Sequence, residues 1–116
     1  MLQSSKEIAE VKETIQKYID GANGDLKVLK EAYNEKALIN GHPIEALFRS
    51  VQYNGKTNAT ARLDYLDVSG HAGVAKVIVE DWHGNDYVEY LQLLKENGKW
   101  TIISKAFDEY LDTFII

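Results

Sequence analysis

Apolar residues in the first half of the chain recur at intervals of three and four, which is the spacing of one helix face. This pattern predicts helices over residues 5–22 and 26–34, followed by a short strand over 36–40. A third helix is expected to begin at Pro43, because the fixed φ of proline suits the first helical position. The apolar residues of this helix fall on one side, as in a helix that lies on a sheet: Ile44, Leu47, Phe48 and Val51.

From residue 58 onward the apolar positions alternate, which is the period of a strand. One run covers 58–68, and three more lie within 72–107. The Asn97-Gly98 pair predicts a hairpin between the last two runs, since both central residues of a type I′ turn need positive φ. Two-residue turns are also expected at 69–70 and 84–85.

Helices gathered before four long strands predict a single α+β domain over residues 1–116, with the helices on one face of a curved antiparallel sheet. Both faces of this sheet are rich in apolar residues, and three helices cover only one of them. We therefore expect a second copy of the chain to cover the outer face, in an isologous homodimer. The apolar tail, 108–116, is expected to extend the last strand or to pack against another segment or subunit.

The assumed turns also predict which residues share a face of the sheet. They place Glu80 directly opposite Glu89, on the face that carries Trp82 and Trp100. A slip of one residue at any turn would exchange the two faces. Two close carboxylates in an apolar cavity tend to share a proton, which would supply a general acid or base. The alternative is that both glutamates are solvated at the open end of the sheet or paired with Lys76 or Lys105.

His83 lies in or beside a predicted turn, next to Trp82. It would serve as a catalytic base if Asp81 or Asp86 oriented it, and is otherwise a solvated turn residue. The histidines come from separate loops without the spacing of a zinc motif, so we expect no metal site. Motifs of serine hydrolases, dinucleotide-binding proteins and P-loops are missing as well, and we expect no cofactor.

Composition narrows the class of partner. A net charge of −5, with the 13 basic residues scattered along the chain, argues against nucleic acid as a partner. The chain has no cysteine, which excludes disulfides and cysteine-based metal sites and fits a cytoplasmic location. No apolar run approaches the length of a membrane span, and the first residues lack the apolar region of a secretory signal.

The first predicted helix ends in YIDGANGD, and the late strands contain DYVEYLQLLKENGKW and TIISKAF. In these segments the chain resembles the putative lumazine-binding family. That family belongs to the SnoaL-like or nuclear-transport-factor-two-like superfamily, which includes ketosteroid isomerase and scytalone dehydratase. The resemblance implies a cystatin-like fold, in which a strongly bent, cone-shaped sheet wraps around three helices and encloses a pocket. It also implies frequent dimerisation through the outer sheet face.

One segment departs from the family pattern. Only Gly41-His42 separates Asn40 from Pro43, where such relatives usually have a longer loop. Either the loop over the pocket mouth is short, or residues are missing from the sequence.

Three hypotheses for function follow. The first is a small-molecule-binding homodimer of unassigned activity, with a pocket of aromatic and acidic residues. The second is an isomerase or dehydratase in which Glu89 or Glu80 abstracts a proton next to a carbonyl, while Tyr87 or His83 stabilises the oxyanion. The third is a structural dimer whose cone is filled by side chains.

The state of the pocket separates these hypotheses. A filled core leaves only the third, an open pocket with a buried, unpaired carboxylate favours the enzyme, and an open pocket without one favours the binding module. The expected pocket residues are five aromatic residues and one glutamate: Tyr18, Phe48, Trp82, Tyr87, Glu89 and Trp100.

Overall fold

The computed structural model describes residues 5–110 and confirms the predicted α+β architecture. Three helices and two short strands precede four long strands. In chain order the elements are α1 (Ser5–Ala22), α2 (Leu26–Ala32), β1 (Tyr33–Ile39), β2 (His42–Pro43), α3 (Glu45–Asn54), β3 (Thr60–Ser69), β4 (Ala72–Trp82), β5 (Asn85–Glu96) and β6 (Lys99–Glu109). The predicted apolar tail begins as the end of β6, and its residues 111–116 lie outside the described residues.

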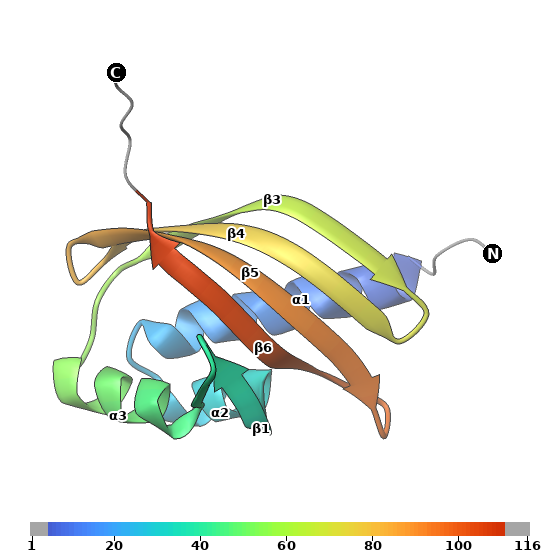
Figure 1. Ribbon diagram of the computed structural model, residues 1–116, viewed down its shortest axis with the longest axis horizontal. Coiled ribbons are helices and arrows are strands. Elements are labelled where there is room, and N and C mark those ends of the chain that lie inside the picture. Colours follow the sequence, from blue (N-terminus) through green and yellow to red (C-terminus); the bar gives the residue numbers. More distant parts are fainter. Residues whose placement is uncertain (1–4, 111–116) are drawn as a thin grey trace.

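The strands form one six-stranded sheet in the order β2-β1-β6-β5-β4-β3. All neighbouring strands are antiparallel except β1 and β6, which are parallel. In Figure 1 the long strands arch over α1, and α2 and α3 lie on the same side of the sheet as α1. The bent sheet therefore has a concave face that packs on helices and a convex outer face.

The early boundaries differ from the predicted ones in two places. The second helix ends at Ala32, so Tyr33 begins a strand that was expected to start at residue 36. Pro43 lies in β2 rather than in the third helix, which begins at Glu45. A two-residue edge strand tolerates proline, because only one side of it takes part in the sheet.

The predicted strand register is wrong at two of the three hairpins. The turns lie at 70–71 and 83–84, one residue from the expected positions, because Ser69 pairs with Ala72 and Trp82 with Asn85. The third turn is at Asn97-Gly98 as predicted, with positive φ at both residues. Irregularities within all three hairpins then shift the pairing again, as β-bulges do.

These shifts change which residues face the helices. On β4 the residues of the main core include Val77 and Val79, whereas Ile78, also buried, lies opposite Arg62 and outside the main core cluster. On β6 the irregularity opposite Gln92 turns Lys105 and Phe107 toward the concave face, where the prediction had placed neither. Inner and outer faces therefore cannot be assigned by simple alternation along these strands.

α1 is held against its neighbours by close packing at its C-terminal end. A Cβ atom at Gly21 would lie 2.4 Å from the backbone of Leu29, so only glycine permits this approach of α1 to α2. Asp25 caps α2 by accepting a hydrogen bond from the Val28 amide. The C-terminal end of α1, which carries Tyr18, is thereby fixed relative to α2.

Candidate functional site

A cavity of about 300 Å³ lies between the concave face of the sheet, α1 and α3. Its lining includes the exposed residues Asn40, His42 and Ala46, so it opens at the side of the molecule where the β1–β2 turn meets α3. The remaining wall is mainly apolar and aromatic, and its members include Tyr18, Ile19, Ala22, Ile39, Leu47, Val79, Trp82, Tyr87 and Phe107. This volume and character are those of a small-molecule site.

Three buried polar side chains meet in the wall of this cavity. Tyr18 on α1 donates a hydrogen bond of 2.7 Å from its hydroxyl to Oε1 of Glu89 on β5. Lys105 on β6 donates from Nζ to the Tyr18 hydroxyl at 2.7 Å and lies 3.5 Å from Oε2 of Glu89. The three residues are only 3–4% exposed. We call Tyr18, Glu89 and Lys105 the polar triad.

Burial determines the protonation behaviour of this polar triad. Loss of hydration lowers the pKa of Lys105 below its ordinary value, and the charge of Glu89 opposes that shift only in part. Burial and the charge of Glu89 together raise the pKa of Tyr18 well above its ordinary value. Tyr18 therefore keeps its proton as a hydrogen-bond donor, and the amine of Lys105 loses its proton more easily than that of a surface lysine.

Aromatic rings surround the polar triad. The Lys105 ammonium lies 4.7 Å from the ring centre of Tyr18 and 5.1 Å from that of Phe107, within the range of cation–π interactions. The Phe107 ring meets the Tyr87 ring edge-on, with 5.6 Å between the ring centres. The Tyr87 ring meets the Trp82 ring in the same way, with 6.3 Å between the centres. Trp82 is anchored by a 2.8 Å hydrogen bond from Nε1 to the carbonyl of Ala22. This row of rings forms one side of the cavity.

Four of the six expected pocket residues line the cavity: Tyr18, Trp82, Tyr87 and Glu89. Phe48 is half-buried on α3 and is not in the cavity wall, and the Nζ of Lys30 lies 5.5 Å from its ring centre. Trp100 is buried near the other end of α1, where Nε1 donates a 2.9 Å hydrogen bond to Oε1 of Glu7.

The predicted juxtaposition of Glu80 and Glu89 is wrong. Glu80 pairs with Thr60 on β3 and is exposed, whereas Glu89 pairs with Val77 and is buried. The shifted turn and the irregularity near the end of β4 separate the two carboxylates.

His83 lies in the β4–β5 turn, with its ring 4.8 Å from that of Trp82. It is not among the residues that line the cavity. Its Nε2 atom is buried and has no hydrogen-bond partner within residues 5–110. Neither Asp81 nor Asp86 orients its ring there, because Asp86 instead accepts a hydrogen bond from the Asp81 amide.

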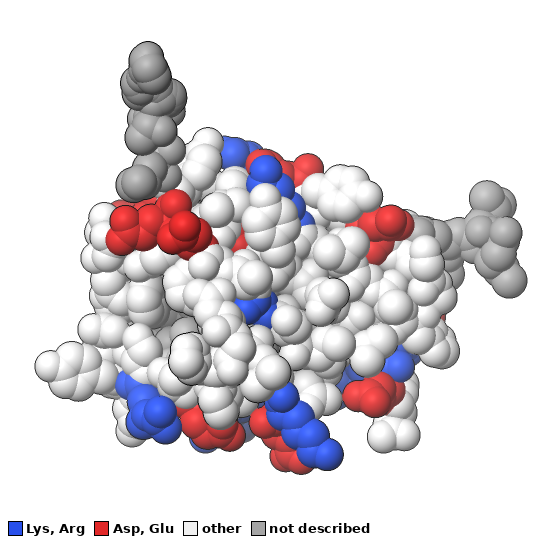
Figure 2. Space-filling model, in the orientation of Figure 1, with Lys and Arg blue, Asp and Glu red and all other residues white. Residues whose placement is uncertain are grey.

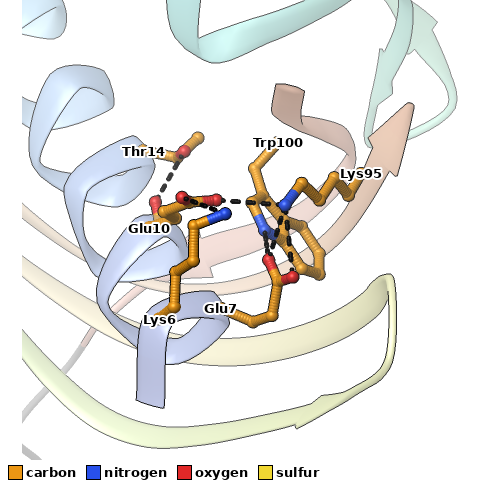
Figure 3. Close-up of polar contacts among 6 residues, drawn as sticks. All are labelled: Lys6, Glu7, Glu10, Thr14, Lys95 and Trp100. Carbon is orange, nitrogen blue, oxygen red and sulfur yellow. Dashed lines mark hydrogen bonds and ion pairs between the residues drawn. The ribbon is translucent and has the colours of Figure 1, made fainter. Parts of the chain in front are cut away.

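A second polar cluster closes the other end of the cone (Figure 3). The Nζ atom of Lys95 lies 2.9 Å from Oε1 of Glu7 and 3.3 Å from Oε1 of Glu10. The Nε1 of Trp100 also donates to Oε1 of Glu7. These hydrogen bonds from Lys95 and Trp100 lower the pKa of Glu7. The cluster ties the start of α1 to the β5–β6 hairpin.

The short segment around Gly41 is a tight hairpin turn over the mouth of the cavity. Asn40 and Gly41 both have positive φ, as a type I′ turn requires, and Ile39 pairs with His42. The Asn40 side chain accepts from the Phe107 amide at 2.9 Å and donates to the Phe107 carbonyl at 3.2 Å. The turn is therefore held against β6 beside the polar triad.

Sequence reasoning offered Lys105 as a partner of the glutamates, which the structure confirms for Glu89, but it did not place Lys105, Asn40 or His42 in the cavity wall. Lys105 is two positions before Phe107 on one strand, so a lysine shares a face with a large aromatic residue. That pattern was the available signal. The predicted register nevertheless puts both residues on the outer face, because no local sequence signal marks the bulge in β6.

Within residues 5–110 no group of three or more histidine, aspartate or glutamate side chains is placed to hold a metal ion. None of the described helices is long and apolar enough to cross a membrane. Figure 2 shows basic and acidic side chains in small groups near the edge of the visible face, and basic atoms also near its middle.

Comparisons with known proteins identify the family. The model of the putative lumazine-binding family matches residues 6–108. The chain belongs to this family. No curated protein matches the chain.

Solved structures place the family in the NTF2-like superfamily. An NTF2-like protein of unknown function from Shewanella baltica is 25% identical and has a TM-score of 0.87, with 97% of this chain and 100% of that chain covered. A second one, from Methylobacillus flagellatus, is 27% identical with a TM-score of 0.87, covering 94% of this chain and 96% of that chain.

A putative ketosteroid isomerase from Shewanella frigidimarina shares the fold. It is 13% identical and has a TM-score of 0.68, with 85% of this chain and 94% of that chain covered. At this identity the similarity is one of fold alone.

Proposed function

We propose that this protein binds a flat, largely apolar small molecule in the cavity, with the polar triad contacting a polar edge of the ligand. The observation that carries the proposal is an open cavity of about 300 Å³ whose apolar wall surrounds one cluster of buried hydrogen-bonding groups. Such a combination orients a ligand by a few polar contacts and binds it through burial of apolar surface. The family description adds lumazine, a flat heterocycle, as a first probe.

The pairing of Glu89 favours the binding hypothesis over the hypothesis of an isomerase or dehydratase with an unpaired carboxylate. Both of its oxygens face donors, one the Tyr18 hydroxyl and the other the Lys105 ammonium. The enzyme hypothesis required an unpaired acid, and the open cavity speaks against a filled cone. The geometry therefore supports the binding module best.

The test is a titration with lumazine in which binding is measured by the quenching of tryptophan fluorescence. Quenching is expected because Trp82 lies in the cavity wall. The Ala46→Phe variant places a ring at the cavity mouth, whereas Glu45→Phe adds the same ring at the neighbouring exposed position outside the lining. We expect A46F to weaken binding at least about tenfold and E45F to leave it within about twofold.

Native mass spectrometry of protein purified from its own source extends the test to other ligands. It would detect a co-purifying small molecule and the number of subunits together. Absence of any bound molecule, together with no saturable quenching by lumazine, would contradict a binding function.

We further propose a homodimer through the outer sheet face. Large apolar side chains stand exposed on this face, with Tyr65 57%, Val74 37% and Tyr90 50% exposed, and they border one shallow groove. Asp64 and Lys76 border the same groove, and a two-fold axis that passes between them would bring opposite charges of the two copies together. The cytoplasmic location stays a prediction from the composition of the chain.

A further inference from the structure

Lys105 is an unusual residue for the wall of an apolar cavity. Its side chain is 4% exposed, and its ammonium has three hydrogen-bond donors, of which the described contacts with Tyr18 and Glu89 use two. A buried ion pair contributes little net stability, because the cost of dehydrating both charges offsets their attraction. Stability of the fold is therefore a weak reason for a lysine at this position.

The surroundings of Lys105 are those of a nucleophilic amine. Burial lowers its pKa, a shift that the charge of Glu89 opposes only in part, and an oxygen of the Glu89 carboxylate lies 3.5 Å from Nζ, in a position to accept its proton. Each unit by which a lysine pKa falls raises the neutral, nucleophilic fraction about tenfold near neutral pH. The wall around the amine is mainly apolar, and an apolar site favours a condensation that releases water.

We infer that Lys105 captures a carbonyl compound, an aldehyde or ketone carried by a flat ligand, as a reversible imine within the cavity. This inference rests on the proposed function, because the carbonyl compound would occupy the same cavity as the bound ligand. It assigns Lys105 the part of the nucleophile, Glu89 that of the acid and base, and Tyr18 that of a positioning residue.

The reaction requires no further reagent. Lys105 first transfers a proton from Nζ to Glu89, and the nitrogen lone pair then attacks the carbonyl carbon while the π electrons move to oxygen. A proton passes from nitrogen to that oxygen, which gives a carbinolamine. Glu89 returns its proton to the hydroxyl, water leaves, and the nitrogen lone pair forms the C=N bond. The products are a protonated imine, beside the Glu89 carboxylate, and one water.

Tyr18 makes these transfers possible by its position. Its hydroxyl accepts from Lys105 and donates to Glu89, both at 2.7 Å, so it holds the amine and the carboxylate on one side of the cavity. The same contact keeps the carboxylate beside the protonated imine, which stabilises that charge in a site with little water.

The experiment uses 2-naphthaldehyde, a flat aromatic aldehyde, with sodium cyanoborohydride to reduce the imine to a stable secondary amine. Peptide mapping of the whole protein by mass spectrometry then locates the adduct. We expect Lys105 to be modified at least about tenfold faster than the exposed lysines, because a larger share of its amine is neutral. The Lys105→Met variant should lose this fast adduct, and Lys76→Met, on the outer face, should retain it.

A matched non-reactive probe separates the two proposals. 2-Naphthalenemethanol has the same ring system but no carbonyl, and its binding is measured by fluorescence quenching. Binding of the alcohol without preferential trapping of the aldehyde at Lys105 would overturn the imine and leave the binding function standing. Trapping spread evenly over the lysines would overturn it as well. Mapping of the unmodified wild-type protein decides the matter even if the Lys105→Met variant does not fold.

Discussion

The hydroxyl of Tyr18 donates a 2.7 Å hydrogen bond to Glu89, 71 positions further along the chain. This contact joins the inner face of α1 to the middle of β5, and Lys105 completes it from β6. The same three side chains thus connect helix and sheet and form the polar part of the cavity wall. Changes to them are expected to alter stability and ligand binding together.

Replacing Tyr18 by phenylalanine removes a donor to Glu89 and an acceptor for Lys105 while keeping the ring. Because both partners are buried, we expect the free energy of unfolding to fall by about 1–3 kcal/mol. Urea unfolding measures this change. Tyr53→Phe is the control, since Tyr53 is 90% exposed and its loss of a hydroxyl should change stability by less than about 0.5 kcal/mol. Equal effects of the two variants would contradict the buried network.

Glu89→Gln leaves the Lys105 ammonium buried without a carboxylate. Breaking one side of a buried ion pair is expected to cost about 3–5 kcal/mol in the free energy of unfolding, less whatever Lys105 recovers by losing its proton. Glu80→Gln makes the same chemical change at an exposed position and should cost less than about 0.5 kcal/mol. The double variant E89Q/K105M removes both charges and should be more stable than E89Q alone. A double variant less stable than E89Q would show that the unpaired charge of Lys105 is not the cause of the lost stability.

The lowered pKa of Glu7 predicts that the folded protein loses stability in acid. This pKa is lowered in the folded state by hydrogen bonds from Lys95 and Trp100, so the folded protein binds fewer protons there than the unfolded chain. The stability that Glu7 contributes is therefore complete above its ordinary pKa of 4.5 and is lost as the pH falls through the folded value. We expect the difference in Tm between wild type and Glu7→Gln to shrink from pH 7 to pH 3.

The control for this prediction is Glu31→Gln. Glu31 forms a 3.8 Å ion pair with Lys17 in which both side chains are more than 40% exposed, so its removal should change Tm little at any pH. A Tm difference for Glu7→Gln that stays constant across the same pH range would count against the hydrogen bonds shown in Figure 3.

The outer sheet face predicts the effect of a charge on assembly. Tyr90→Lys would place a second cation beside Lys76, whose Nζ lies 5.9 Å from the Tyr90 ring. We expect the dimer dissociation constant to rise at least about tenfold, as for the loss of a central aromatic contact. Sedimentation equilibrium checks this, with wild type near twice 13.1 kDa and Tyr53→Lys as a control at an exposed site on α3. Wild type that sediments as a monomer would end the dimer proposal.

Several features follow from local residue patterns. The apolar stripe of α1 and the capping of α2 by Asp25 depend on neighbours in sequence, as does the Asn97-Gly98 turn, and the structure contains all three. Four aromatic or acidic residues of the cavity wall were also predictable. They are large or charged residues either on the concave face of the sheet or on the helix that packs against it.

The sequence by itself determined the order and type of every element except the two-residue strand β2, because helix and strand periods, caps and type I′ turns depend on short-range sterics and hydrogen bonds. Only the tertiary structure decided which side of β4 and of the end of β6 faces the helices. Those assignments depend on bulges that accommodate the bend of the whole sheet. For that reason Lys105 joined Glu89 in the cavity, whereas Glu80 was left exposed on the strand next to it.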